Sequence, residues 1–132
     1  MSLSKPKRVL VCGGRDCTDQ DFVWGELDKL HTFFGFKFVI EGGARGVDSL
    51  AGGWATQRGL INLKFPAEWE RLGRGAGHAR NKEMLVKGKP DMVIVFPGGK
   101  GTNNMRETAL KHGVPVLRFC LDPGKASQVW SS

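Results

Sequence analysis

Cysteine is scarce in this chain of 132 residues, and its arrangement excludes a disulfide framework. The three cysteines, Cys12, Cys17 and Cys120, form no CxxC pair, and an odd number cannot all be joined in disulfides. Reduced thiols are therefore the expectation. Cys12 falls in an apolar segment, where a thiol is expected to be inert.

Long apolar segments are also absent. No run of apolar residues approaches the length of about 20 needed to span a bilayer. No signal-peptide core follows the basic start that contains Lys5, Lys7 and Arg8. We therefore expect a cytoplasmic protein without a membrane partner.

Several patterns of catalytic chemistry are missing as well. No spacing of His, Cys, Asp and Glu suggests a metal site, and no Ser-His-Asp or Cys-His arrangement emerges. The GxxxxGK[ST] pattern of a P-loop is absent, because Lys100 precedes its glycine. We expect no bound metal and no required cofactor.

The length and composition predict one globular domain. Hydrophobic residues make up 40% of the chain and charged residues 25%, and no linker, repeat or low-complexity segment interrupts it. We expect the domain to cover residues 8–120, between a flexible N-terminal tail (1–7) and a C-terminal tail (121–132). The formal charge of +7 suits an anionic ligand, either a nucleotide or a nucleic acid.

Apolar runs alternate with helical patterns along the chain. Strands are expected at 8–12, 36–40, 61–65, 92–96 and 114–119, and helices at about 18–34, 47–58, 78–87 and 103–112. Thr18 is the expected N-cap of the first helix and Thr102 that of the last. This α/β alternation predicts a single Rossmann-like, doubly wound sheet of five parallel strands, with helices on both faces.

The most informative segment is the apolar run Met92–Phe96, which leads directly into a turn rich in glycine. Bare backbone at the start of a helix offers unpaired N–H groups and the positive end of the helix dipole to an anion. This turn therefore predicts a phosphate site, made of Pro97, Gly98, Gly99, Lys100, Gly101 and Thr102.

Two further glycine-rich turns follow the first and second predicted strands. Because the carboxyl ends of parallel strands share one edge of the sheet, all three turns are expected to meet at a ligand site. The additional candidate residues in these two turns are Gly13, Gly14, Arg15, Asp16, Gly42, Gly43, Arg45 and Asp48.

Further residues near this edge are candidates for contacts with a ligand. Arg80 and Asn81, at the start of the third helix, are candidates for phosphate recognition. Asp16 and Asp48 suit either a ribose hydroxyl or a turn or capping role. Trp69, in the long loop from 66 to 77, is a candidate for stacking on a base.

The motifs resemble those of the SLOG superfamily, which joins the DNA-processing protein A proteins with the Lonely Guy phosphoribohydrolases. The run 97–102 resembles the PGGxGT motif, and 78–84 resembles the Lonely Guy HxRKxxM segment, with Asn81 in place of its Lys. The turns at 13–16, 42–48 and 77–81 together look most like the small YspA-type (cpYpsA-related) branch of bacteria and phages.

The resemblance implies nucleotide binding at the strand ends, and it implies a homodimer. Lonely Guy enzymes cleave the N-glycosidic bond of nucleoside monophosphates, using a glutamate in PGGxGTxxE together with the arginine that matches Arg80. Here Met105 occupies the position of that glutamate. Arg80 and Glu41 remain candidates for catalysis, because hydrolysis of this kind needs a nearby carboxylate.

Three functions are consistent with the sequence. The favoured one is a sensor or carrier that binds a nucleotide or a nucleotide-derived ligand of the ribose-phosphate or ADP-ribose type. The first alternative is cleavage of the N-glycosidic bond of a nucleoside monophosphate. The second is binding of single-stranded nucleic acid, as the charge of +7 allows.

Overall fold

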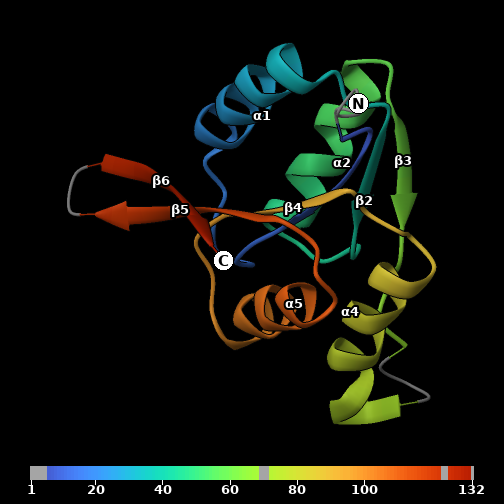
Figure 1. Cartoon of the computed structure of the whole chain (residues 1–132). Helices are drawn as coiled ribbons and strands as arrows, with labels where there is room; N and C mark the ends of the chain where they lie inside the picture. Colours follow the sequence, from blue (N-terminus) through green and yellow to red (C-terminus); the bar gives the residue numbers. More distant parts are fainter. Residues whose placement is uncertain (1–5, 69–71, 123–124, 132) are drawn as a thin grey trace.

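The computed structural model describes residues 6–68, 72–122 and 125–131. Within these residues strands and helices alternate along the chain (Figure 1). Their bounds are β1 (Arg8–Cys12), α1 (Gln20–Phe34), β2 (Phe38–Glu41), α2 (Val47–Gln57), β3 (Ile61–Lys64), η1 (Gly73–Gly75), α4 (Ala76–Val86), β4 (Met92–Val95), α5 (Lys100–Lys111), β5 (Val116–Asp122) and β6 (Lys125–Ser131).

All these strands lie in one sheet of order β3-β2-β1-β4-β5-β6. The strands from β1 to β5 pair in parallel, which confirms the predicted doubly wound α/β fold. The chain winds outward from β1 to β3 on one side and from β4 to β5 on the other. The winding therefore reverses between β1 and β4, where such sheets bind ligands beyond the strand ends.

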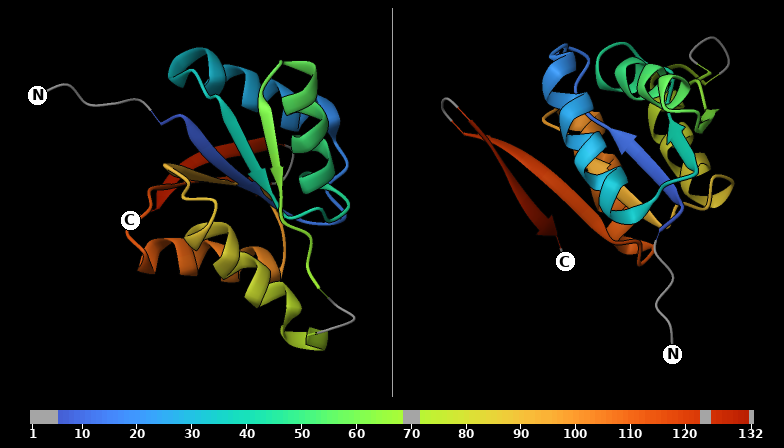
Figure 2. Two further views of the ribbon diagram at one scale, coloured as in Figure 1. Left: turned by 90° about the vertical axis from the view of Figure 1, so that its right-hand side faces the viewer. Right: turned by 90° about the horizontal axis from the view of Figure 1, so that it is seen from above.

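The sheet separates two hydrophobic layers (Figure 2). Helices α1 and α2 cover one face, where Leu27 and Trp54 are fully buried against Val11 and Ile94. Helices α4 and α5 cover the other face, where Met84 and Met105 pack against alternate residues of the same strands. Each central strand is thus buried on both sides, which explains its continuous apolar sequence.

Two predicted helix caps were wrong. Asp19 rather than Thr18 caps α1, and its carboxylate accepts a hydrogen bond from the Phe22 amide at 3.1 Å. Helix α5 begins at Lys100 with Gly99 as its N-cap, so that Thr102 lies inside the first turn and is buried. The capping patterns in the sequence allow either position, and the packing of the turn decides between them.

The C-terminal segment, whose structure was not predicted, provides an antiparallel sixth strand. Strands β5 and β6 pair from Val116 with Ser131 to Asp122 with Lys125. Figures 1 and 2 show this two-stranded ribbon extending beyond the helices. Near the N-terminus, Lys7 was expected to lie in the flexible tail. Its backbone amide instead donates a hydrogen bond to the Asp91 carboxylate at 2.9 Å, so Lys7 is part of the folded domain.

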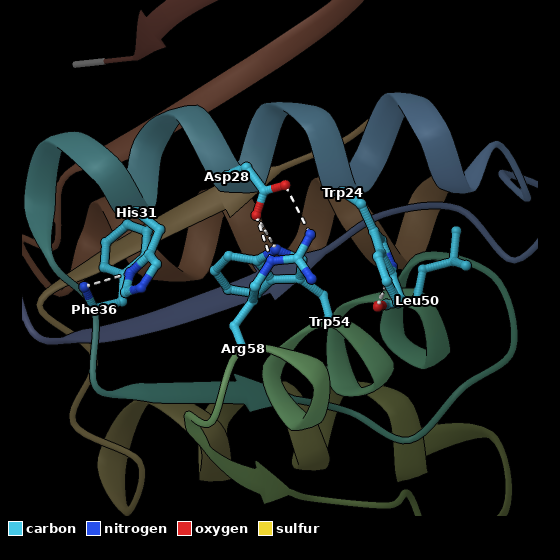
Figure 3. Close-up of polar contacts among 7 residues, drawn as sticks. All are labelled: Trp24, Asp28, His31, Phe36, Leu50, Trp54 and Arg58. Atoms are coloured by element: carbon cyan, nitrogen blue, oxygen red, sulfur yellow. Dashed lines mark hydrogen bonds and ion pairs between the residues drawn. The ribbon is translucent and has the colours of Figure 1, made fainter.

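One polar network joins α1 to α2 on the outer side of the domain (Figure 3). The Asp28 carboxylate accepts from the Trp54 indole at 2.8 Å and from two nitrogens of Arg58 at 2.8 and 2.9 Å. The hydrogen bond from Arg58 holds the pKa of Asp28 at about 2. Trp54 is fully buried, so Asp28 is the acceptor that its indole N–H needs.

We predict that Asp28→Ala lowers the free energy of unfolding by about 1–3 kcal/mol, because the buried Trp54 indole loses its acceptor. Urea unfolding at pH 7 measures the change. Asp28→Asn keeps an acceptor oxygen and should retain most of the stability. Equal losses in the two variants would show that the exposed ion pair with Arg58, rather than the indole, determines the effect.

Candidate functional site

The three glycine-rich turns meet at Gly14. Its amide donates to the Pro97 carbonyl at 2.8 Å, which joins the turn after β1 to the turn after β4. Its carbonyl accepts from the Val47 amide at 3.2 Å, which joins the same turn to the start of α2. These hydrogen bonds fix the three turns relative to one another at the point where the winding reverses.

Several glycines at this junction are required by the packing of the protein itself. Gly46 has a φ of 80°, in the left-handed region, and a Cβ there would meet the Gly14 carbonyl oxygen. A Cβ on Gly98 would lie 2.7 Å from the Gly14 nitrogen and would also collide with the Thr102 hydroxyl. A Cβ on Gly42 would run into the guanidinium of Arg80.

A cleft of about 480 Å³ opens beside this junction, a size in the range of small-molecule sites. Its walls come from the turns after β1, β2 and β4 and from residues of α4 and α5. The lining residues are Cys12, Gly13, Gly14, Arg15, Ala44, Asp48, Gly77, His78, Arg80, Asn81, Met84, Gly99, Gly101, Thr102 and Met105.

Gly99 and Gly101 differ from the glycines of the junction. Apart from the chain neighbours and the backbone of α5, no atom of the described residues lies within 4 Å of where a Cβ would stand on either residue, and neither has a positive φ. Both line the cleft at the start of α5, where backbone N–H groups have no partner within the helix. Their missing side chains leave open space at the positive end of a helix dipole.

Arg80 is held in place by the protein and still faces the cleft. Its Nη1 donates to the Gly42 carbonyl at 2.6 Å, and its Nε donates to the Asn81 side-chain oxygen at 3.0 Å. Asn81 in turn donates to the Gly101 carbonyl at 3.2 Å and to Asn104 at 2.9 Å. The guanidinium is thereby pre-organised beside the open glycine turn.

Among the described residues, Asp48 is the one carboxylate that lines the cleft. Its Oδ2 accepts a hydrogen bond from the Ala44 amide at 3.2 Å, and Asp48 is only 7% exposed to solvent. Burial raises the pKa of Asp48 to about 6, although backbone hydrogen bonds and the charge of Arg80 oppose the rise. The group can therefore change its charge near neutral pH.

The floor of the cleft is apolar. Met84 from α4, Met105 from α5 and Cys12 from β1 line it, and all three are buried. Burial raises the pKa of the Cys12 thiol far above its usual range, which agrees with the expectation of an inert thiol. The floor offers van der Waals contact rather than an ionised group.

The comparisons with known proteins place the chain in a family. Residues 7–72 match the model described as "YspA, cpYpsA-related SLOG family". The chain belongs to this family. The Gene 61 protein of Mycobacterium phage D29 is 39% identical over 121 residues, which cover 86% of this chain and 96% of that protein.

The SLOG fold is also seen in a solved structure. DNA processing protein A (DprA) from Streptococcus pneumoniae superimposes with a TM-score of 0.69 at 21% identity, over 88% of this chain. The chain spans about half (51%) of the length of that protein. At this level of identity the likeness concerns the fold alone.

Not all the predicted site residues of this SLOG protein line the cleft. Arg45 pairs with Asp16 at 3.4 Å on the exposed surface, and Glu41 faces the other side of the sheet. Trp69 lies outside the described residues. The predicted residues that are described but do not line the cleft are Asp16, Glu41, Gly42, Gly43, Arg45, Pro97, Gly98 and Lys100.

Sequence reasoning also missed part of the lining. Cys12 and Ala44 give no signal of their own, because apolar and small residues of this kind are typical of any core. His78 and Met84 belong to the segment that resembles the HxRKxxM motif, and Met105 occupies the position of the Lonely Guy glutamate, so the sequence did hold a signal for these three residues. Gly77 lies in the first turn of α4, which begins earlier than predicted.

Two glycine variants test this geometry. Gly98→Ala should lower the free energy of unfolding by about 1–3 kcal/mol, because its methyl group overpacks the junction with Gly14 and Thr102. Gly99→Ala should cost less, within about 1 kcal/mol, because its methyl group enters open space and only the preference of an N-cap for glycine over alanine is lost. Urea unfolding of the pair measures both, and equal losses would contradict the distinction.

The raised pKa of Asp48 predicts a pH dependence of stability. Its folded pKa of about 6 exceeds the ordinary pKa of 3.8 for an aspartate side chain, so the folded state binds more protons between these values. Stability should therefore decrease as the pH rises from about 4 through 6, by up to about 3 kcal/mol for this group. Asp48→Asn should abolish that decrease in urea titrations between pH 4 and 8. A decrease of the same size in the variant would assign it to another group.

Proposed function

We propose that this SLOG protein binds a nucleotide or nucleotide-derived ligand in the cleft, as a sensor or carrier. The observation that carries the proposal is the open start of α5, where Gly99 and Gly101 leave space over first-turn N–H groups that have no partner within the helix. A phosphate at this point would also face the pre-organised guanidinium of Arg80. Family membership supports the same class of ligand.

The rest of the cleft suits the other parts of a nucleotide. Asp48, when ionised, is an acceptor that a ribose hydroxyl could reach from a phosphate at α5, since both line the same cleft. The apolar floor of Met84 and Met105 offers contact to a flat base or to the ribose ring. Polar groups thus surround an apolar floor, as in many small-molecule sites.

Hydrolysis of the N-glycosidic bond is a second candidate, favoured by one observation. Met105, at the position of the Lonely Guy glutamate, supplies no acid, but Asp48 is a carboxylate in the same cleft with a pKa of about 6. A group of this pKa is suited to proton transfer near neutral pH. Chromatography of nucleotides incubated with the protein decides between the two, and release of a free base would establish the enzyme.

Binding is tested by thermal unfolding against a panel of ligands. The panel contains AMP, GMP, CMP, UMP, NAD, ADP-ribose, cyclic nucleotides and a short single-stranded DNA. A ligand at about 100 times its Kd adds roughly 2.7 kcal/mol to stability, which should raise Tm by several degrees. We expect a shift with one small nucleotide or ADP-ribose compound.

Two matched alanine variants locate the binding site. Gly99→Ala should weaken the shift, because its methyl group occupies the space proposed for phosphate. Gly25→Ala, in α1 and equally free of close neighbours, should leave it unchanged. A shift given only by DNA and removed by modest salt would replace the nucleotide proposal with nucleic-acid binding.

A further inference from the structure

A second groove lies on the opposite side of the turn after β2, away from the cleft. It has a volume of about 250 Å³ and runs between α2 and the edge strand β3, which lie side by side in Figures 1 and 2. Its lining residues are Glu41, Gly43, Ser49, Gly52, Gly53, Thr56, Asn62 and Lys64. None of them lines the cleft, so the two sites are distinct.

Glu41 is the centre of this groove and is fully buried. Its Oε1 accepts from the Gly43 amide at 2.5 Å, and its Oε2 accepts from the Asn62 side-chain nitrogen at 3.2 Å. Both partners are neutral, and no ion pair of Glu41 occurs within the described residues. Buried carboxylates in proteins are usually paired with a cation or bound to a metal ion.

Asn62 adds a buried oxygen, Oδ1, that has no hydrogen-bond partner among the described residues. Turning the amide over would bring Oδ1 against the Glu41 carboxylate, so the hydrogen bond to Glu41 fixes the orientation. A buried acceptor without a partner indicates a missing donor or ion.

The hydroxyl groups of Ser49 and Thr56 can act only as hydrogen-bond acceptors toward a ligand in the groove. Ser49 donates its proton to the Ala44 carbonyl at 3.0 Å, and Thr56 donates to the Gly52 carbonyl at 3.1 Å. The oxygens of Ser49 and Thr56 are therefore left as acceptors. Apart from the exposed Lys64 at the rim and the second N–H of the Asn62 amide, the described side chains of the groove offer oxygen acceptors to a ligand.

Gly52 makes room for this arrangement within α2. A Cβ there would lie 2.9 Å from the Asn62 nitrogen and 3.1 Å from Glu41 Oε2. Glycine inside a helix costs roughly 1 kcal/mol relative to alanine. The space beside the Glu41–Asn62 pair therefore exists although alanine at position 52 would stabilise the helix more than glycine does.

We propose that this groove binds a small hard cation through the oxygens of Glu41 and Asn62, either a metal ion or an ammonium group. One carboxylate with neutral oxygens suits an alkali or alkaline-earth ion or a primary amine, all of which seek oxygen ligands. Within the described residues no three His, Cys, Asp or Glu side chains gather, as zinc would require. The inference does not depend on the function of the cleft.

Thermal unfolding of the whole chain in choline chloride, at constant ionic strength, tests the site. Sodium, potassium, magnesium, calcium and methylammonium chlorides are each added in exchange for choline, which is too large for direct oxygen coordination. At ten times its Kd, the bound cation should raise Tm by roughly 5 °C. Comparison of the metal chlorides with methylammonium chloride shows whether the site prefers a metal ion or an ammonium group.

Two variants keep the result interpretable. Glu41→Gln preserves the shape of the side chain and should abolish the rise. Asn62→Asp adds a second carboxylate and should make Tm depend strongly on calcium or magnesium. The proposal fails if no cation exceeds choline, if Glu41→Gln keeps the full rise, or if Lys64→Gln alone lowers Tm without any cation response, since Lys64 would then be the counter-ion.

Discussion

The junction at Gly14 is the constraint on which the rest of the structure depends. One residue donates to the Pro97 carbonyl and accepts from the Val47 amide, so that three turns from distant parts of the sequence share one point. The glycines that make this possible are those with no room for a Cβ, such as Gly46 and Gly98. The open glycines at 99 and 101 are then held at the wall of the cleft.

Three charged side chains near the cleft form hydrogen bonds with the backbone of one short turn. Glu41 accepts from the Gly43 amide, Asp48 accepts from the Ala44 amide, and Arg80 donates to the Gly42 carbonyl. The two carboxylates lie close enough for the charge of Glu41 to contribute to the raised pKa of Asp48. An anionic ligand in the cleft and a cation at Glu41 would therefore act on the same segment of backbone from opposite sides.

The fold and the position of the site were predictable because their signals are local. Strands buried on both faces are continuously apolar, and the glycine turns that follow them mark the strand ends, so the parallel sheet and the edge that carries the cleft follow from the order of the elements. The direction of individual side chains was not predictable in this way. Glu41 ends β2 and Asp48 lies in the first turn of α2, on either side of one short turn, yet Glu41 lines the groove and Asp48 lines the cleft.

The C-terminal strand shows a second limit. Strand β6 lies at the edge of the sheet and pairs only with β5, and its sequence alternates too weakly to be distinguished from a polar tail. The helix starts were uncertain by one to three residues, because neighbouring residues such as Thr18 and Asp19 are both good caps. Pairing with β5 settles the first question, and the local hydrogen bond from the Phe22 amide to Asp19 settles the start of α1.

The central claim is that an anionic ligand binds at the open start of α5, and amide NMR tests it most directly. A ¹⁵N-labelled sample is titrated with the ligand that stabilises the protein most, and the backbone amide shifts are followed. The account predicts the largest changes at Lys100, Gly101 and Thr102, with smaller ones at Ala44 and His78 across the cleft. Changes confined to the β5–β6 ribbon, with the α5 amides unmoved, would contradict it.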